Sequence, residues 1–352
     1  MEQEQFNPRT DLSALNEAVN QIRNVLGNII IGQKQVIDFL IVGLLADGHI
    51  LIEGVPGVAK TLSAKLLAKS IDAQFSRVQF TPDLMPSDVL GTPIFNTKTG
   101  DFEFRKGPIF GNIILVDEIN RAPAKTQSAL FEVMEERQIT IDGHTYIMDE
   151  PFMVLATQNP IEQEGTYRLP EAQLDRFLFK IEIKYPSLEE ETAILLAQHT
   201  LVNKTLLNEV KPVLSVQQIK EARAIIRSLF VEPKLLEFIA KIVNETRNNS
   251  SLYLGASPRA SLAIAHSAKA FAAIQNRDFV TPEDIIAVAG PVLAHRILLS
   301  PEKEMEGLTT TDIIHQIIKK LKCQGRLVYI YQSTIFSLPL ATTVNPFKQL
   351  TD

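Results

Sequence analysis

The chain has 352 residues, of which 45% are hydrophobic and 22% charged, enough for a globular core divided over two or three domains. Its formal net charge of −6 disfavours a nucleic-acid partner, although a local basic patch stays possible. Cys323 is the only cysteine, which excludes an intrachain disulfide and favours a reducing compartment. A secretory signal, a membrane-spanning run and histidines at metal-ligand spacing are all lacking, so we expect a soluble cytoplasmic protein.

The first half of the chain alternates between helical and strand-like apolar patterns. Leucine, valine and isoleucine recur at helical spacing over residues 12–26, and a second apolar helix is expected over residues 36–45. A further helix is expected over residues 125–137, and continuous apolar runs predict buried strands at residues 49–53, 75–80, 112–116, 152–156 and 177–183. This alternation, which continues to about Pro186, predicts a parallel sheet with helices on both faces.

Two hairpins are expected as insertions into this α/β frame. Residues 92–95 and 102–105 read as short strands around a turn at residues 97–100, with a long surface loop as the alternative. Residues 139–141 and 145–147 flank an Asp-Gly pair, which is a strong signal for a tight hairpin turn.

After Pro186 the pattern changes to helices alone. Ser187 and Glu190 form a capping box, and two later helices each begin with a Ser-Pro or Thr-Pro pair. We therefore expect an α/β part over residues 1–186 and an all-helical part over residues 187–321. The tail over residues 322–352 is apolar and β-prone, and we have no physical account of it.

Residues 54–61, GVPGVAKT, have the layout of a P-loop between a strand and a helix. Small residues let backbone N–H groups surround phosphate oxygens, and the helix N-terminus adds partial positive charge. Lys60 can neutralise the terminal phosphates, while the Thr61 hydroxyl can hold Mg²⁺. Ala59 stands where the usual motif has glycine, so we expect a negative φ there. An ordinary strand-to-helix turn is the alternative.

Two acids, Asp117 and Glu118, directly follow the apolar strand at residues 112–116. The carboxyl edge of a parallel sheet is where ligands bind in such folds. Asp117 can hold Mg²⁺, and Glu118 can polarise the water that attacks a γ-phosphate; two solvated acids are the alternative. Asn159 ends the next strand and can help to orient that water, although Asn before Pro is also a turn signal.

Two arginines complete the set of candidate residues. Arg176 lies just before the last strand, where an ion pair with Asp175 or a nearby acid is the structural alternative. Arg259 lies in the first turn of a helix, where the helix dipole disfavours a cation. An anion brought to Arg259, such as a γ-phosphate in the transition state, would explain its position.

The motifs GVPGVAKT, VDEINRAP, KTQSALFEVMEE, ATQNP, LPEAQLDRF and GASPRAS, in this order and spacing, resemble the MoxR family of AAA+ ATPases. The resemblance extends from about Leu12 to Glu306, and alanine before the P-loop lysine is usual in this family. It implies a P-loop AAA+ fold, with a five-stranded parallel sheet in the order 5-1-4-3-2 over residues 1–186 and an all-α lid over residues 187–321.

The resemblance also implies a role for each candidate residue. Asp117 and Glu118 would form Walker B, Asn159 sensor 1, Arg176 the arginine finger that reaches a neighbouring subunit, and Arg259 sensor 2. The two hairpins would be the helix-2 insert and the pre-sensor-1 hairpin. The residues expected to contact ATP are Ile31, Gly32, Gly54, Val55, Pro56, Gly57, Val58, Ala59, Lys60, Thr61, Leu62 and Arg259.

Family members form rings, usually hexamers, and are thought to remodel client proteins, commonly with a partner that carries a von Willebrand A domain. The resemblance therefore implies Mg²⁺-dependent ATP hydrolysis, and the net charge of −6 already disfavours a nucleic-acid partner. The rival functions are a nucleic-acid motor, disfavoured by mixed charges at the tip of the first hairpin, and the ATPase subunit of a metal chelatase. A nucleotide-gated scaffold without hydrolysis is a third rival, which the Asp117-Glu118 pair disfavours.

Overall fold

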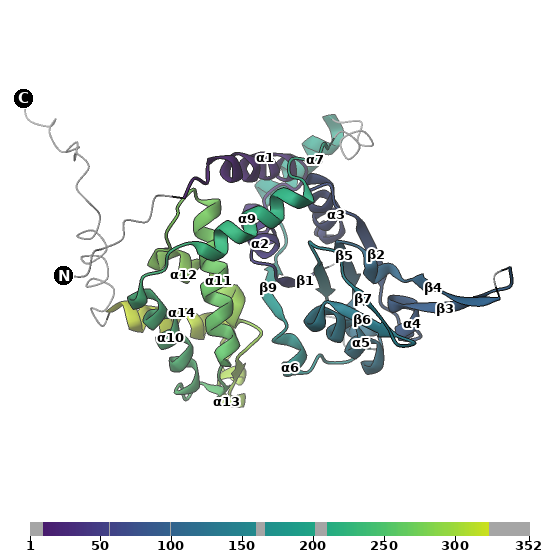
Figure 1. The fold of residues 1–352 in the computed structure, drawn as a ribbon. Helices are drawn as coiled ribbons and strands as arrows, with labels where there is room; N and C mark the ends of the chain where they lie inside the picture. Colours follow the sequence, from purple (N-terminus) through teal and green to yellow (C-terminus); the bar gives the residue numbers. More distant parts are fainter. Residues whose placement is uncertain (1–9, 56, 99, 160–165, 201–209, 324–352) are drawn as a thin grey trace, which may run out of the picture.

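The computed structural model describes residues 10–55, 57–98, 100–159, 166–200 and 210–323. An α/β part built on a central sheet lies beside a group of helices (Figure 1). The predicted tail lies outside the described residues from residue 324 onward. The proposed division of the chain at residue 186 stays a prediction.

The central sheet has five parallel strands. Their spatial order is β2 (Phe75–Gln79), β5 (Ile113–Asp117), β8 (Met153–Gln158), β1 (His49–Gly54) and β9 (Phe177–Ile183). Counted along the chain, this is the order 5-1-4-3-2, so the predicted topology is confirmed. All five strands were predicted, with bounds that differ by two residues at most.

Helices cover both faces of the sheet, as the continuous apolar strands predict. Successive residues of β1 enter two different cores, because Ile50 and Ile52 face one side and Leu51 the other. The first core contains buried residues of α1 (Ser13–Ile29), α2 (Lys34–Leu45) and α3 (Lys60–Ser70). The second core is closed by α5 (Ala124–Glu136), which contributes Leu130 and Phe131.

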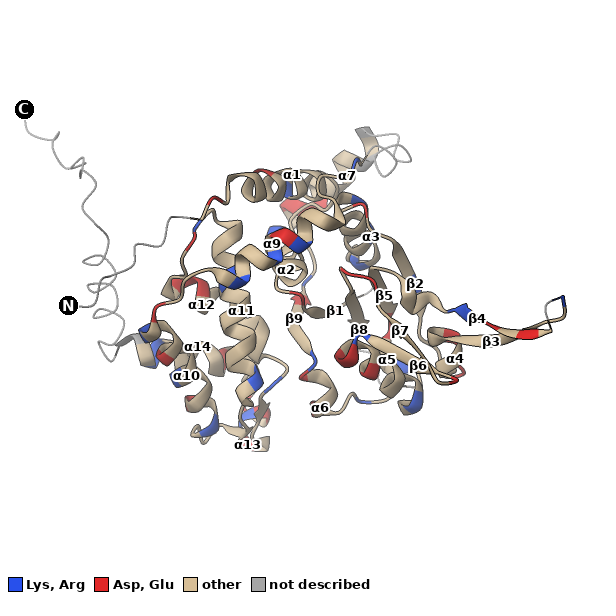
Figure 2. Cartoon of the chain, in the orientation of Figure 1, with Lys and Arg blue, Asp and Glu red and all other residues tan. Residues whose placement is uncertain are grey.

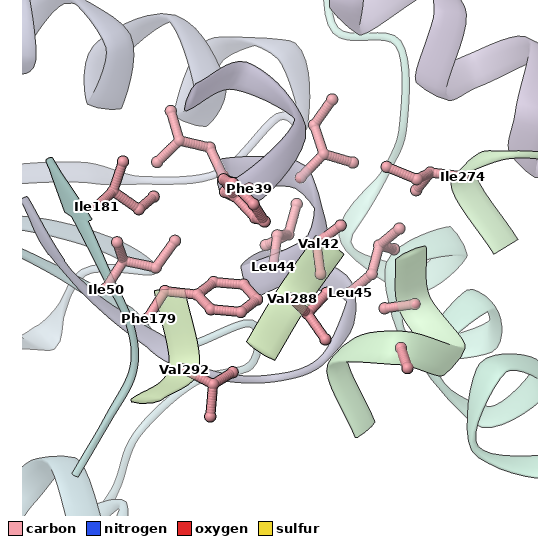
Figure 3. Close-up of a cluster of buried hydrophobic side chains, with 14 of the residues drawn as sticks. Phe39, Val42, Leu44, Leu45, Ile50, Phe179, Ile181, Ile274, Val288 and Val292 are labelled. Atoms are coloured by element: carbon pink, nitrogen blue, oxygen red, sulfur yellow. The ribbon is translucent and has the colours of Figure 1, made fainter. Parts of the chain in front are cut away.

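The helical part shares the first core with the sheet. Phe39 of α2 lies 5.2 Å, centroid to centroid, from Phe179 of β9, and Val288 and Val292 of α12 (Pro282–Leu293) lie close by (Figure 3). Its other helices are α7 (Leu188–Thr200), α9 (Val216–Ser228), α10 (Pro233–Arg247), α11 (Pro258–Ile274), α13 (Pro301–Met305) and α14 (Thr310–Cys323). A short antiparallel pair, β10 (Leu252–Leu254) with β11 (Leu298–Leu299), adds to the predicted helices.

Both predicted hairpins are present. β3 (Gly91–Asn96) and β4 (Asp101–Lys106) form a hairpin that projects from the sheet next to α4 (Pro86–Leu90), so the alternative of a long loop is wrong (Figure 1). β6 (Gln138–Ile141) pairs with β7 (His144–Ile147) in the second hairpin. Short helical turns complete the α/β part: η1 (Pro108–Phe110), η2 (Ile119–Arg121) and α6 (Glu171–Leu174).

Candidate active site

The P-loop leads from β1 into α3, which begins at Lys60. Ala59 has φ +59° and ψ 22°, so the expectation of a negative φ at this position is wrong. The chain must reverse sharply here, and the backbone N–H and the hydroxyl of Ser63 both donate to the Ala59 carbonyl, at 2.9 and 3.0 Å. This left-handed conformation costs an alanine about 1 kcal/mol relative to glycine.

The remaining P-loop residues lie at the carboxyl edge of the sheet. The Lys60 ammonium donates to the Gly54 carbonyl at 2.7 Å, which folds the side chain back over the loop. Gln33 donates to the Val58 carbonyl at 3.2 Å, so the segment that contains Ile31 and Gly32 lies next to the loop. Val58 is buried, Val55 and Leu62 pack against the first core, and Thr61 follows Lys60 in the first turn of α3. Pro56 lies outside the described residues.

Asp117 is buried at the end of β5 and is held by two donors. The Thr157 hydroxyl donates to Asp117 Oδ1 at 3.1 Å, and Arg77 Nε donates to Asp117 Oδ2 at 2.7 Å. Carboxylate and hydroxyl oxygens suit Mg²⁺, which usually binds one or two carboxylates together with substrate phosphates. Asp117 and Thr61 offer these two kinds of oxygen, and the described ranges contain no group of three or more His, Cys, Asp or Glu side chains that could hold a metal by themselves.

Glu118 has φ +55° and follows Asp117 into η2. Its backbone N–H donates to the Thr157 hydroxyl at 3.0 Å, so one threonine contacts both acids of the pair. Its carboxylate oxygen Oε2 accepts from Gln79 at 2.8 Å and pairs with Arg121 Nε at 2.9 Å. Asn159 directly follows β8, whose Gln158 pairs with Glu53, so Asn159 is level with the start of the P-loop.

Sequence analysis missed four residues around the acidic pair: Arg77, Gln79, Arg121 and Thr157. Three of them are polar residues near the carboxyl ends of β2 and β8, the strands that flank β5. Polar side chains at the ends of neighbouring parallel strands meet at one edge, and that signal could have found them. Arg121 has no such signal, because its contact depends on the turn made by η2.

Arg176 lies at the opposite edge of the sheet. It immediately precedes Phe177, which pairs with His49 at the start of β1, whereas Gly54 at the other end pairs with Ile183. Five residue steps separate these ends, which is roughly 16 Å along a parallel strand. Arg176 therefore cannot reach the P-loop of its own subunit.

Arg259 lies at the same amino edge as Arg176. Glu135 Oε2 is 3.2 Å from Arg176 Nε, and Glu135 Oε1 accepts from an Arg259 NH2 group, also at 3.2 Å. The structural alternative for Arg176 was an ion pair with Asp175 or a nearby acid. The structure shows a pair with Glu135, while Asp175 pairs with Arg296 at 2.6 Å. These five side chains line one cavity of about 320 Å³.

Comparison with known proteins agrees with this fold. The profile of the ATPase family associated with various cellular activities (AAA) matches residues 49–179, and that of the AAA lid domain matches residues 244–317. A crystallised protein from Cytophaga hutchinsonii, 45% identical, superposes with a TM-score of 0.80 over 87% of this chain and 96% of its own. The chain therefore has the fold of an AAA ATPase with its lid.

Two relatives show to which family of AAA ATPases the chain belongs. YeaC of Bacillus subtilis is 46% identical over 88% of this chain and 94% of its own length. Chaperone MoxR1 of Mycobacterium tuberculosis is 42% identical over 88% of this chain and 82% of its own. The chain belongs to the MoxR family of AAA ATPases, and this membership implies ATP hydrolysis. Among the residues that the structure describes, no helix is both long and apolar enough to cross a membrane.

Proposed function

We propose that the chain forms a ring, of six subunits, and hydrolyses Mg·ATP at sites shared between neighbours in order to remodel a client protein. The observation that supports this most directly is the separation of the candidate residues onto two edges of one sheet. The P-loop, Asp117 and Glu118 are at the carboxyl edge, while Arg176 and Arg259 are at the amino edge. A head-to-tail ring brings the two edges of adjacent subunits together.

Each half of the proposed site has a distinct chemical task. Lys60 and the backbone N–H groups of the P-loop would hold the phosphates, and Thr61 with Asp117 would hold Mg²⁺, which neutralises phosphate charge when bound. Glu118 would accept a proton from the attacking water, which Asn159 helps to orient. The neighbour's Arg176 and Arg259 would then stabilise the charge on the γ-phosphate, so that Arg259 acts in trans.

A protein client is favoured over a nucleic acid by the charges of the projecting hairpin. The hairpin carries both signs of charge, since β4 has two acids, Asp101 and Glu103, followed by Arg105 and Lys106, while β3 has no charged residue. Acidic and basic residues are also interspersed over the molecule (Figure 2). At the same hairpin Phe95 and Phe102 are exposed and stack edge to face, with centroids 5.3 Å apart, which suits an apolar protein surface. The name of the relative Chaperone MoxR1 supports this function. We also propose that the protein acts in the cytoplasm, together with a partner protein that carries a von Willebrand A domain.

Mixed rings test the shared site. Arg176→Ala and Glu118→Gln subunits should each be nearly inactive alone, but should complement each other after subunit exchange. About a quarter of the interfaces in a random equal mixture join an intact P-loop half to an intact arginine half, because the interfaces are heterologous. ATPase rates of both variants, alone and in mixed rings verified by tagged pull-down, are the measurement. Wild-type activity of Arg176→Ala alone, or no rescue in verified mixed rings, would contradict the proposal.

A further inference from the structure

One carboxylate joins the two arginines at the amino edge. Glu135 lies in the last turn of α5, Arg176 in the segment between α6 and β9, and Arg259 in the first turn of α11. Each guanidinium contacts a different oxygen of the same carboxylate, both at 3.2 Å. The carboxylate therefore sets the spacing of two cations that come from separate elements of the fold.

The helix ends around this cluster oppose the charges placed on them. Glu135 is an acid at the C-terminal end of α5, and Arg259 is a cation at the N-terminal end of α11, which are the unfavourable positions for both signs. Arg176 and Arg259 also repel each other, because both guanidiniums lie next to the same carboxylate. Contact of Glu135 with both cations offsets the two unfavourable helix-end positions and the repulsion between the arginines. This explains why the three side chains converge.

The cluster is open to solvent and incompletely bonded. The exposed fractions of the side chains are 27% for Arg176, 37% for Glu135 and 59% for Arg259, whereas the neighbouring Arg296 is 4% exposed in its pair with Asp175. Within the described part of the chain, Arg176 Nε is buried and makes no hydrogen bond, although it lies 3.2 Å from Glu135, while Arg176 NH1 donates to the Ala172 carbonyl. An additional acceptor oxygen can therefore reach this cluster from outside.

We infer that Glu135 is a positioning residue that holds Arg176 and Arg259 side by side, as a stand-in anion, until the γ-phosphate of a neighbouring subunit's ATP replaces it. This inference rests on the shared site proposed above. A terminal phosphate offers three acceptor oxygens to two guanidiniums, whereas the carboxylate offers two. Glu135 would therefore present both arginines already paired and spaced to the incoming phosphate.

The first test compares Glu135→Gln with Glu136→Gln, a matched variant that removes the same charge from the exposed neighbouring position of α5. A glutamine replaces one of the two carboxylate oxygens by an NH2 donor and removes the negative charge, so it cannot hold the two guanidiniums on separate oxygens as Glu135 does. We expect kcat to fall about tenfold or more in Glu135→Gln, since small misplacements of catalytic groups have effects of this size. The Kd for ATP on the subunit's own P-loop should stay within about twofold of wild type, as should both constants of Glu136→Gln.

The second test repeats Glu135→Gln in an Arg259→Ala background, with single-turnover hydrolysis as the readout. Only one arginine remains to be held there, so the effect of Glu135→Gln should shrink to less than about twofold. If Glu135 acted only in folding, Glu135→Gln would reduce the single-turnover rate by the same factor in the wild-type and the Arg259→Ala backgrounds. Glu135→Asp, which keeps the charge but is one methylene shorter, should lie between Glu135→Gln and wild type.

Three results would overturn the inference: equal factors in the two backgrounds, a Glu135→Gln rate equal to that of Glu136→Gln, or a Glu135→Gln rate above wild type. The last result would mean that the carboxylate competes with the phosphate instead of preparing the arginines. Full activity of Arg176→Ala would be a different failure, because it removes the shared site itself and leaves Glu135 with nothing to position.

Discussion

At the carboxyl edge of the central sheet, two of the candidate residues themselves have a left-handed backbone, whereas at the amino edge two candidate arginines share one acid through ion pairs. Ala59 and Glu118, at the first edge, both have a positive φ. Arg176 and Arg259, at the second, have no positive φ, although Arg137 beside them does. Both arginines pair with Glu135, and Arg176 also donates to the Ala172 carbonyl at 3.1 Å. Strain fixes groups in the geometry that a reaction needs, while ion pairs can be exchanged when another anion arrives. The proposed shared site therefore assigns the binding of the nucleotide to the first edge and the response to it to the second.

The largest effect is expected at the carboxyl edge, from Glu118→Gln. This variant keeps the P-loop and should still bind ATP, but it should lose at least about a hundredfold in turnover, the lower range for a positioned base. Lys60→Ala should behave in the opposite way and lose most of its affinity for ATP. Binding of a fluorescent ATP analogue and steady-state ATPase rates separate the two outcomes. Hydrolysis by Glu118→Gln at the wild-type rate would show that another group is the base.

A smaller loss is expected from Thr157→Val, which is nearly isosteric but removes the hydroxyl between the two acids. Without it, Asp117 loses one donor and the partly buried N–H of Glu118 loses its acceptor. Residues that orient catalytic or metal-binding side chains typically contribute ten- to a hundredfold, so we expect a loss of about that size. Thr157→Ser keeps the hydroxyl and is the control. The Mg²⁺ dependence of the ATPase rate is the measurement, and an unchanged profile in Thr157→Val would remove this role.

Sequence patterns predicted the carboxyl edge better than the amino edge, for a physical reason. Gly54, Asp117 and Asn159 each follow an apolar strand, and parallel strands bring their carboxyl ends together whatever the rest of the chain does. Glu135, in contrast, lies 124 positions before Arg259 in the sequence, and the two meet only because α11 packs beside the α/β part. Spacing along the chain contains no signal for that approach. The sign of φ at Ala59 was also missed, because the resemblance explains the residue but not its backbone.

Acid should destabilise the protein, because two buried histidines lie at the amino edge. His49 contacts the Met134 carbonyl and accepts from Val154 N–H, and His295 contacts the Phe177 carbonyl. Burial, with a contribution from Arg137, lowers the pKa of His49 from 6.5 to about 3. Burial and Arg296 also lower the pKa of His295 well below its usual value.

The sign of the pH effect follows from these two lowered pKa values. Above pH 6.5 both histidines are neutral in the folded and unfolded states, so their contribution to stability is fully present. As the pH falls below 6.5 the unfolded chain gains protons that the folded protein cannot accept, and the loss continues down to the folded pKa. For His49 alone the free energy of unfolding should fall by about 1.4 kcal/mol at pH 5.5, and His295 should add to this in the same direction.

Denaturant unfolding at pH 7.5, 6.5 and 5.5 measures this loss. His49→Gln should lower the free energy of unfolding at pH 7.5, but this free energy should then change less with pH than in the wild type. His144→Asn, at an exposed position, should leave the pH dependence unchanged. Constant stability of the wild-type protein over this range would contradict the assignment of neutral, buried histidines to the amino edge.

The smallest effect, and the only gain, is expected from Ala59→Gly at the carboxyl edge. Glycine adopts a φ of +59° without the steric contact that an alanine Cβ makes with its own backbone, which is worth about 1 kcal/mol. Glycine also has more freedom in the unfolded chain, which offsets roughly 0.4–1 kcal/mol of that gain. The net change should therefore be a stabilisation of less than about 1 kcal/mol. Ala224→Gly, at an exposed position within α9, should instead destabilise by about that amount, because its backbone is helical. Opposite shifts in the thermal midpoints of the two variants would confirm that Ala59 stores strain, whereas a destabilised Ala59→Gly would show that this turn does not require a left-handed residue.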